Sequence, residues 1–234
     1  MAGALAVLSG QAPPVGLDLV LCLVAGVLGG IGVTALYQAL AIGRMGIVAP
    51  VTGVLAAVIP VAAGILTEGL PSPLVVAGIL IAIIAVVLVS RVRDAGAGRA
   101  GLREALLGGA AIGLFGVVIA QIESGLFGSL SIIRLTQAVL VLALILVTRQ
   151  AWRPAPRLLP ALTVIGLLDM AGNSSYLIAV QAGALAVASV LSSLYPVGTV
   201  ILAAVLLHER ITRDHAIGII LAGAAIVMIG LGST

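Results

Sequence analysis

The chain has very little charge and no lysine at all. Its 234 residues are 62% hydrophobic and only 8% charged, whereas a soluble domain carries roughly 25% charged residues. So few charges cannot cover a surface that faces water. The low charge therefore excludes an ordinary soluble domain, and it indicates that the natural solvent of the chain is lipid.

Cysteine is also nearly absent. Cys22 is the only one, and it lies within an apolar run, which excludes an intrachain disulfide and a cysteine-rich metal site. The motifs HExxH and GxSxG, a histidine pair and a phosphate-binding loop are missing as well. We therefore expect no metal, no cofactor and no enzymatic activity. An aspartyl intramembrane protease would need paired carboxylates, and only Asp169 lies centrally in an apolar run.

The apolar residues gather in long runs. A helix needs ~20 apolar residues to cross a bilayer core of roughly 30 Å. The runs do not alternate between polar and apolar residues, as membrane strands do, so we predict an all-α membrane protein of about eight transmembrane helices. The predicted spans are 17–41, 46–67, 72–90, 104–123, 127–148, 158–181, 184–207 and 214–232.

Arginine supplies all the basic residues, and its placement predicts the orientation in the membrane. Ten of the eleven arginines fall in alternate loops, and the opposite loops and both termini have none. Cytoplasmic loops are enriched in basic residues. We therefore predict a multi-pass protein of the plasma or inner membrane with both termini extracytoplasmic, and no nucleic-acid partner. The ten are Arg44, Arg91, Arg93, Arg99, Arg103, Arg149, Arg153, Arg157, Arg210 and Arg213.

A weak internal repeat relates the first three predicted helices to the last three. Tyrosine, an acidic residue and glycine recur in the same order, although apolar helices also resemble one another by composition alone. The spans 104–123 and 127–148 have no counterpart in the first copy, so the chain reads as three helices plus five. The matched residues are Tyr37 with Tyr176, Glu68 with Glu209, and Gly78 with Gly218.

A unit of five helices crosses the membrane an odd number of times, so a second such unit enters the membrane from the opposite side. This predicts an inverted-repeat transporter bundle. The predicted divisions are an incomplete first repeat over 1–91, a polar cytoplasmic linker over 92–103, and a second repeat over 104–234.

Several stretches, taken in order, resemble a known family. The first is ALYQALAIGRMGIVAP from Ala35, followed by EGLPSP from Glu68. Later come GLLDMAGN from Gly166, VLSSLYP from Val190 and HER from His208. From about residue 18 onward, the chain resembles EamA-like members of the drug/metabolite transporter superfamily.

The resemblance implies a secondary transporter that exports a small metabolite or drug by alternating access, with proton coupling. The family usually has ten helices, so we expect this chain to lack the first and most of the second, either through a misassigned start or as a shortened form. The alternative function is a non-transporting or inactive fragment or scaffold of such a transporter. An intramembrane enzyme is less favoured.

Charged and amide groups inside the predicted helices are candidates for a solute site, because a charge at the bilayer centre costs ~2.5–3.5 kcal/mol or more. Asp169, Asn173 and Tyr176 share one helix face. They form either a substrate or proton site or a structural hydrogen-bond cluster. Arg134 could pair with Asp169 or with Glu123, bind an anionic group, or extend to the outer interface.

A second group of candidates surrounds Pro196, which frees a backbone carbonyl one turn earlier. Serine hydroxyls nearby suit a solute passage, or they simply let helices approach closely. Tyr37 and Gln38 are the counterparts in the first repeat, where the family resemblance implies cavity-forming helices. The predicted substrate-binding residues are Tyr37, Gln38, Arg134, Asp169, Asn173, Ser189, Ser192 and Tyr195.

Two glycine motifs bear on the partners of the chain. Gly26-x-x-x-Gly30 and Gly109-x-x-x-Gly113 allow helices to pack closely. They more often join helices within one bundle than form dimers, so a homodimer is possible but not required. The expected partners are the lipid bilayer and a small neutral, zwitterionic or weakly anionic solute.

Overall fold

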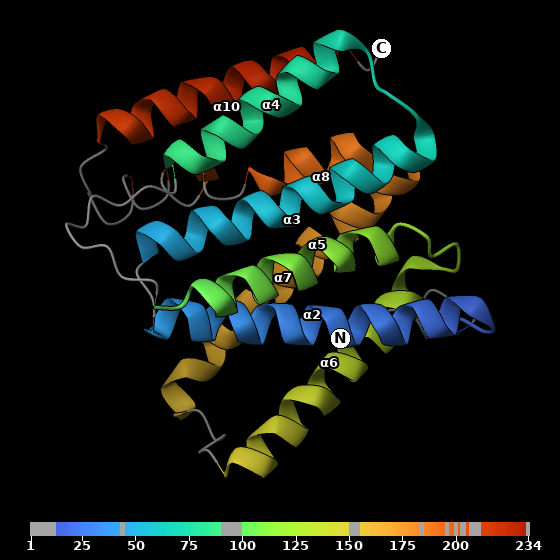
Figure 1. Cartoon of the computed structure of the whole chain (residues 1–234). Coiled ribbons are helices and arrows are strands. Elements are labelled where there is room, and N and C mark those ends of the chain that lie inside the picture. The colour runs from blue at the N-terminus through green and yellow to red at the C-terminus, as the bar shows by residue number, and fades with distance from the viewer. Residues whose placement is uncertain are drawn as a thin grey trace. The chain divides into compact units, whose positions relative to one another are not determined.

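The computed structural model describes residues 13–42, 45–89, 100–149, 155–182, 185–194, 197–198, 201, 205 and 212–232. All regular structure in these ranges is helical, which confirms the all-α prediction (Figure 1). The helices are α2 Leu17–Ile42, α3 Met45–Glu68, α4 Pro73–Val89, α5 Leu102–Ile119, α6 Leu126–Thr148, α7 Leu159–Ala182, α8 Leu185–Ser193 and α10 Arg213–Gly232. The 3-10 turn η1, Pro156–Leu158, precedes α7.

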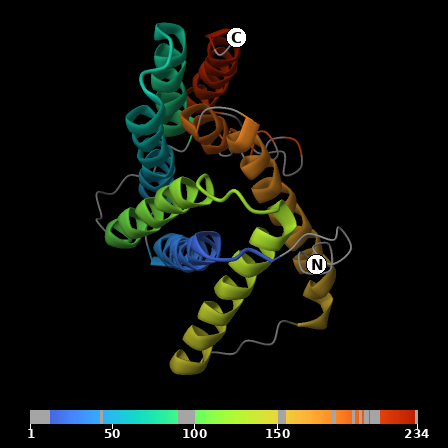
Figure 2. The ribbon, with the colours of Figure 1, turned by 90° about the vertical axis from the view of Figure 1, so that its right-hand side faces the viewer.

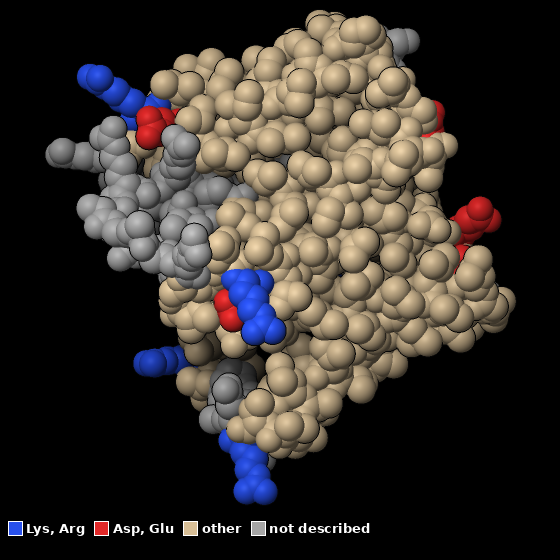
Figure 3. All heavy atoms as spheres, in the orientation of Figure 1, with Lys and Arg blue, Asp and Glu red and all other residues tan. Residues whose placement is uncertain are grey.

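Helix length and surface both fit a bilayer. Most of the surface drawn in Figure 3 belongs to uncharged residues, and many large apolar side chains are exposed. Such a surface is stable in lipid rather than in water. Within the described ranges, the segments long and apolar enough to cross a membrane are Leu17–Ile42, Val51–Glu68, Leu102–Ile119, Leu126–Thr148 and Pro156–Ala182, and α4 is apolar but shorter.

One predicted span ends earlier than expected. The span 104–123 stops as α5 at Ile119, where Gln121 N–H donates to Val118 O at 3.1 Å and tightens the last turn. Within the predicted span 184–207, α8 ends at Ser193, and the residues described beyond it at 197, 198, 201 and 205 are again helical. There the N–H of Leu194 donates to Leu191 O at 3.3 Å in a similar turn.

The chain forms two compact units, each built from two separate segments. Unit 1 comprises residues 1–30 and 118–182, and unit 2 comprises residues 31–117 and 183–234. Unit 1 therefore holds the first half of α2 with α6 and α7. Unit 2 holds the second half of α2 with α3, α4, α5, α8 and α10. The repeat boundaries predicted at 91 and 104 stay a prediction.

In unit 2, α3 and α4 form a hairpin that packs on α8 and α10. Helices α4 and α10 lie side by side in both ribbon views (Figures 1 and 2). Ser72 Oγ, just before α4, donates to Gly232 O at the end of α10 at 2.9 Å. Glu68 at the end of α3 accepts the N–H of Leu185, at the start of α8, at 3.1 Å. Both pairs are therefore antiparallel.

This pairing matches helices that the repeat relates. The predicted counterpart of α3 is the span that contains α8, and the counterpart of α4 is α10. One apolar cluster joins all four helices, with Val61, Ile79, Val190 and Ile229 among its buried members. An inverted repeat has two copies of opposite direction. The antiparallel pairs have the relative direction that this architecture requires.

Glycine sets the distance between several helices. A Cβ on Gly109 would lie 2.8 Å from Leu55 Cβ and 3.0 Å from Thr52 Cα, so α5 and α3 are in backbone contact. Gly113 lies equally close to α3, one turn later. Lipid tails supply little hydrophobic force between helices, and close packing replaces it. The motif at 109–113 therefore joins two helices of unit 2.

The other glycine motif works in the same way in unit 1. Gly26 lies against Thr136 of α6, and Gly30 lies against Leu140. The contact point moves from Thr136 to Leu140 on α6 as it moves from Gly26 to Gly30 on α2. The two helices therefore run parallel. Both glycine motifs join helices within one unit, as the sequence favoured.

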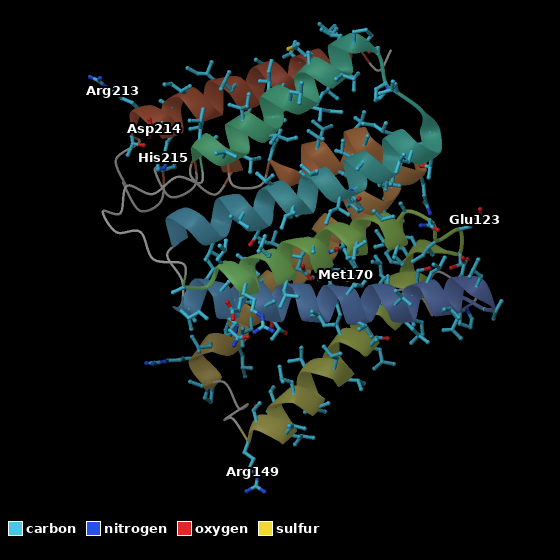
Figure 4. The ribbon with its side chains drawn as sticks, in the orientation of Figure 1. Glu123, Arg149, Met170, Arg213, Asp214 and His215 are labelled. Carbon is cyan, nitrogen blue, oxygen red and sulfur yellow. The ribbon has the colours of Figure 1, made fainter. Side chains whose placement is uncertain are left out.

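Most of the described charges lie near helix ends. In unit 1, Arg149 ends α6, and Glu123 lies near the start of that helix (Figure 4). Arg157 lies just before α7, and Asp18 contacts the loop before α6. One end of this unit is thus basic and the other acidic.

The described arginines of unit 2 also lie at one end, together with Glu104 and Asp214. Thr52 Oγ1 of α3 donates to Ala105 O of α5 at 3.2 Å, and Gly109 and Gly113 follow along α3 in the same direction. Helix α5 is therefore parallel to α3. Arg103 begins α5 and Arg213 begins α10, so both lie at the end away from Glu68. This is the distribution that the arginine bias predicted.

A methyl group at Gly109 should destabilise the protein. We expect Gly109→Ala to lower the free energy of unfolding by about 1–3 kcal/mol, because overpacking forces the helices apart. Thermal unfolding in detergent measures this. Gly223→Ala in α10 is the control, since nothing lies within 4 Å of its added Cβ, and we expect an unchanged or higher midpoint. Equal losses in the two variants would contradict the packing role.

Candidate solute site

An ion pair between α6 and α7 forms the centre of the site in unit 1. Arg134 Nη2 pairs with Asp169 Oδ2. Arg134 lies roughly two turns into α6, and Asp169 lies near the middle of α7. Of the partners that the sequence left open for Arg134, the structure gives Asp169. Glu123 instead lies in the loop after α5 (Figure 4).

Two amide side chains complete the pair. Arg134 Nη1 donates to Gln137 Oε1 at 2.7 Å. Asn173 Nδ2 donates to the Asp169 backbone carbonyl at 2.8 Å and to Asp169 Oδ1 at 3.3 Å. Residues three and four apart lie on the same helix face, so each charge has a neutral partner on its own helix. The site is therefore a network of four residues with a net charge of zero.

Sequence reasoning missed Gln137. The available signal was an amide three residues after Arg134 in an otherwise apolar stretch of helix. Asn173, by contrast, was predicted from its spacing to Asp169.

The structure places the remaining predicted residues elsewhere. Tyr37 and Gln38 are exposed on the second half of α2, which belongs to unit 2. Ser189 is buried and Ser192 is exposed on α8, also in unit 2. Tyr195 lies outside the described residues. Arg134, Asp169 and Asn173 are thus the predicted residues that the structure brings together, and the solute-binding role of all eight stays a prediction.

A second polar cluster ties the start of α2 to the loop before α6. The Asp18 carboxylate accepts the N–H of Ser124 at 2.8 Å, and the Ser124 and Ser129 hydroxyls lie 2.9 Å apart. Gln181 Nε2, at the end of α7, donates to Ile122 O at 3.4 Å. These bonds satisfy loop backbone groups that α5 and α6 leave open. The cluster therefore fixes three helix ends and has no evident chemical role.

Metal chemistry has no obvious place in the described part of the chain. His, Cys, Asp and Glu side chains do not come together there in a group of three or more that could hold an ion. The ionisable groups nearest the middle of unit 1 are the two members of the ion pair. Binding and orienting a charged solute is what this arrangement can do.

The family follows from a comparison with known sequences. The model described as the EamA-like transporter family matches residues 100–231. The chain belongs to the EamA-like transporter family. The match runs from the start of α5 into α10 and includes both helices of the ion pair. Membership confirms the predicted resemblance and makes the protein a multi-pass membrane protein of the drug/metabolite transporter type.

Solved structures agree on the fold. One, described only as the crystal structure of a protein, superposes with a TM-score of 0.79 at 17% sequence identity. The alignment covers 98% of this chain and 83% of that chain. At such low identity the likeness shows the fold alone. No curated protein matches the chain significantly.

Substitutions at the two residues of the ion pair should have coupled effects on the free energy of unfolding. We expect Arg134→Gln and Asp169→Asn each to destabilise the protein by about 1–3 kcal/mol, because each leaves the other charge without its partner. The side chains are 31% and 51% exposed, so the loss should be smaller than for a fully buried pair. The double variant should lose less than the sum of the two. Thermal unfolding of the four proteins measures the coupling, and strictly additive losses would argue against it.

Proposed function

We propose that the protein is a secondary transporter that moves a small solute across the membrane, and that the network around Arg134 and Asp169 is part of its solute site. Family membership supports transport in general. The observation that carries the proposal is an ion pair between two apolar helices of membrane-spanning length. Ionisable residues within membrane spans are costly, and they commonly mark solute or ion pathways.

We further propose alternating access as the mechanism. The antiparallel pairs α3 with α8 and α4 with α10 support it, because they match the helices that the internal repeat relates. In transporters with inverted repeats, one repeat rocks against the other around a site near the bilayer midplane. Export as the direction of transport rests on the family resemblance alone.

Catalysis is not part of the proposal. An aspartyl intramembrane protease needs two carboxylates that share a site. In the described part of unit 1, Asp18 and Glu123 lie near helix ends, whereas Asp169 is held by a guanidinium and an amide. This environment favours the binding of charge over proton transfer between acids.

Solute release from proteoliposomes tests the function. Liposomes containing the purified protein would be loaded with a mixture of labelled small metabolites, and release would be followed by mass spectrometry. We expect release of at least one solute faster than from protein-free liposomes. Asp169→Asn should slow that release about tenfold or more, the cost of losing a charged hydrogen bond.

Asp214→Asn, in the first turn of α10, is the matched control and should transport at the wild-type rate. Wild-type release by Asp169→Asn would remove Asp169 from the solute site. No release of any solute by the wild type would contradict the transporter function.

We propose that the protein lies in the plasma or inner membrane with the Arg149 and Arg157 end in the cytoplasm, as the arginine bias favours. In a Cys22→Ala background, Glu123→Cys should react with a membrane-impermeant maleimide in intact cells. Arg157→Cys should react only after the cells are permeabilised. The reverse labelling pattern would invert the orientation.

A further inference from the structure

We infer that unit 1 binds an anionic phospholipid along α6 and α7. The lipid headgroup lies at Arg149 and Arg157, and the acyl chains run along the apolar helix surfaces beside these two residues. The surface does not include the pair of Arg134 and Asp169, and the inference does not depend on solute transport.

The two arginines at the basic end of unit 1 have no counter-ion in the part of the chain that the structure describes. Arg149 and Arg157 are exposed, and neither forms an ion pair with a described residue. In the sequence, no acidic residue lies between Glu123 and Asp169. The described arginines that begin α5 and α10 differ, because an acidic residue directly follows each of them. The basic end of unit 1 therefore carries charge that an outside anion can balance.

The end of α6 leaves the side chain of Arg149 free for a ligand. A basic side chain at a helix C-terminus often binds the last carbonyls of that helix, but other donors take two of them here. Thr148 Oγ1 donates to Leu144 O at 2.7 Å, and the N–H of Arg149 donates to Ile145 O. The Arg149 side chain extends beyond the end of the helix (Figure 4). A phosphate group suits it, because a guanidinium binds two phosphate oxygens through parallel hydrogen bonds.

The helix surfaces next to these arginines are apolar and exposed on every side. All residues from 159 to 168 of α7 are exposed, and so are those from 141 to 148 of α6 except the partly buried Ile145. The buried residues of both helices lie in the opposite halves, as Ile133 and Leu177 do. The threonine hydroxyls in the two exposed stretches donate to carbonyls of their own helix. An acyl chain beside either stretch therefore meets apolar side chains and no unsatisfied hydroxyl.

The length of this surface fits one leaflet of a bilayer. The stretch 159–168 rises about 15 Å at 1.5 Å per residue, which is half of a hydrocarbon core of roughly 30 Å. The ends of α6 and α7 that carry the arginines stand apart in Figure 2, so each presents its apolar surface separately. Chains of one leaflet can cover these surfaces along their whole length.

The arginines decide which lipid is preferred. Basic residues at the cytoplasmic ends of membrane helices attract anionic headgroups. A zwitterionic headgroup also offers a phosphate, but it brings its own cation next to the two guanidinium groups. An anionic phospholipid supplies the missing negative charge without that repulsion. The apolar surface and the unbalanced charge thus point to the same ligand.

Two photoreactive lipids test the inference. Phosphatidylglycerol and phosphatidylcholine would carry the same diazirine-labelled acyl chain, each at a low fraction in phosphatidylcholine bilayers that contain the purified full chain. Mass spectrometry of the crosslinked peptides gives the yield on each helix. We expect phosphatidylglycerol to exceed phosphatidylcholine by about tenfold or more on 141–148 and 159–168, because each arginine beside an anionic headgroup adds roughly fivefold in affinity. The exposed residues Ile220 and Val227 of α10 should show no such excess.

Substitutions at the arginines should remove this preference. Arg149→Gln and Arg157→Gln should each lower the excess of phosphatidylglycerol several-fold, and the double variant should abolish it. Arg103→Gln and Arg213→Gln are the matched controls, since these exposed arginines have acidic neighbours, and they should keep the wild-type ratio. Unchanged midpoints of thermal unfolding in all variants would show that the fold is intact.

Three results would overturn the inference: equal yields of the two lipids on α6 and α7, an equal excess of phosphatidylglycerol on every helix, or an excess that survives the double variant. Glycerophosphoglycerol, which is the headgroup without acyl chains, separates a lipid site from a site for soluble phosphate esters. We expect a large excess of it to leave the labelling unchanged. A strong reduction would assign the arginines to a soluble anion and would also overturn the inference.

Discussion

A backbone amide in hydrocarbon has no water to bind, and each unsatisfied group costs several kcal/mol. Helices satisfy these groups locally, and all described regular structure in this chain is helical. Lipid provides little force to hold such helices together, so contact comes from small residues. Gly26 and Gly109 bring a helix directly against its neighbour. Where the backbone leaves a helix, side chains take over, as Asp18 does for the N–H of Ser124.

The same absence of water constrains charge. Most described charged residues lie near helix ends, with arginines at one end of each unit. Arg134 and Asp169 depart from this rule, and each is held by the other and by an amide. The two side chains are 31% and 51% exposed, and exposed ion pairs add little stability. The stability of the fold alone therefore does not account for two charges in the middle of apolar helices.

Much of the fold was predictable, because membrane thickness limits helix length and apolar runs are easily seen. The ends of α2 and α3 lie within a residue or two of their predicted positions. The end of α5 was predicted four residues too late. The N–H groups of Gln121 and Ile122 donate to Val118 O and Ile119 O in tight turns that end the helix, and an apolar run does not reveal such turns.

The site was predictable only in part. The four-residue spacing on α7 predicted that Asn173 lies next to Asp169. Spacing along one helix does not show which other helix lies beside it. The partner of Arg134 therefore stayed open until the structure gave Asp169. Gln137 was missed because its role depends on where the arginine side chain turns, and periodicity does not reveal that. Tyr37 and Ser189 lie in unit 2, and their part in the site stays a prediction.

The most direct test is a solid-state NMR measurement of the coupling between labelled arginine nitrogens and labelled carboxyl carbons in lipid. Without solute, the protein should show an arginine–aspartate coupling that Arg134→Gln abolishes. With a saturating amount of a solute that the protein transports, that coupling should weaken as the solute contacts the site. An unchanged arginine–aspartate coupling with that solute bound would contradict a solute site at the ion pair.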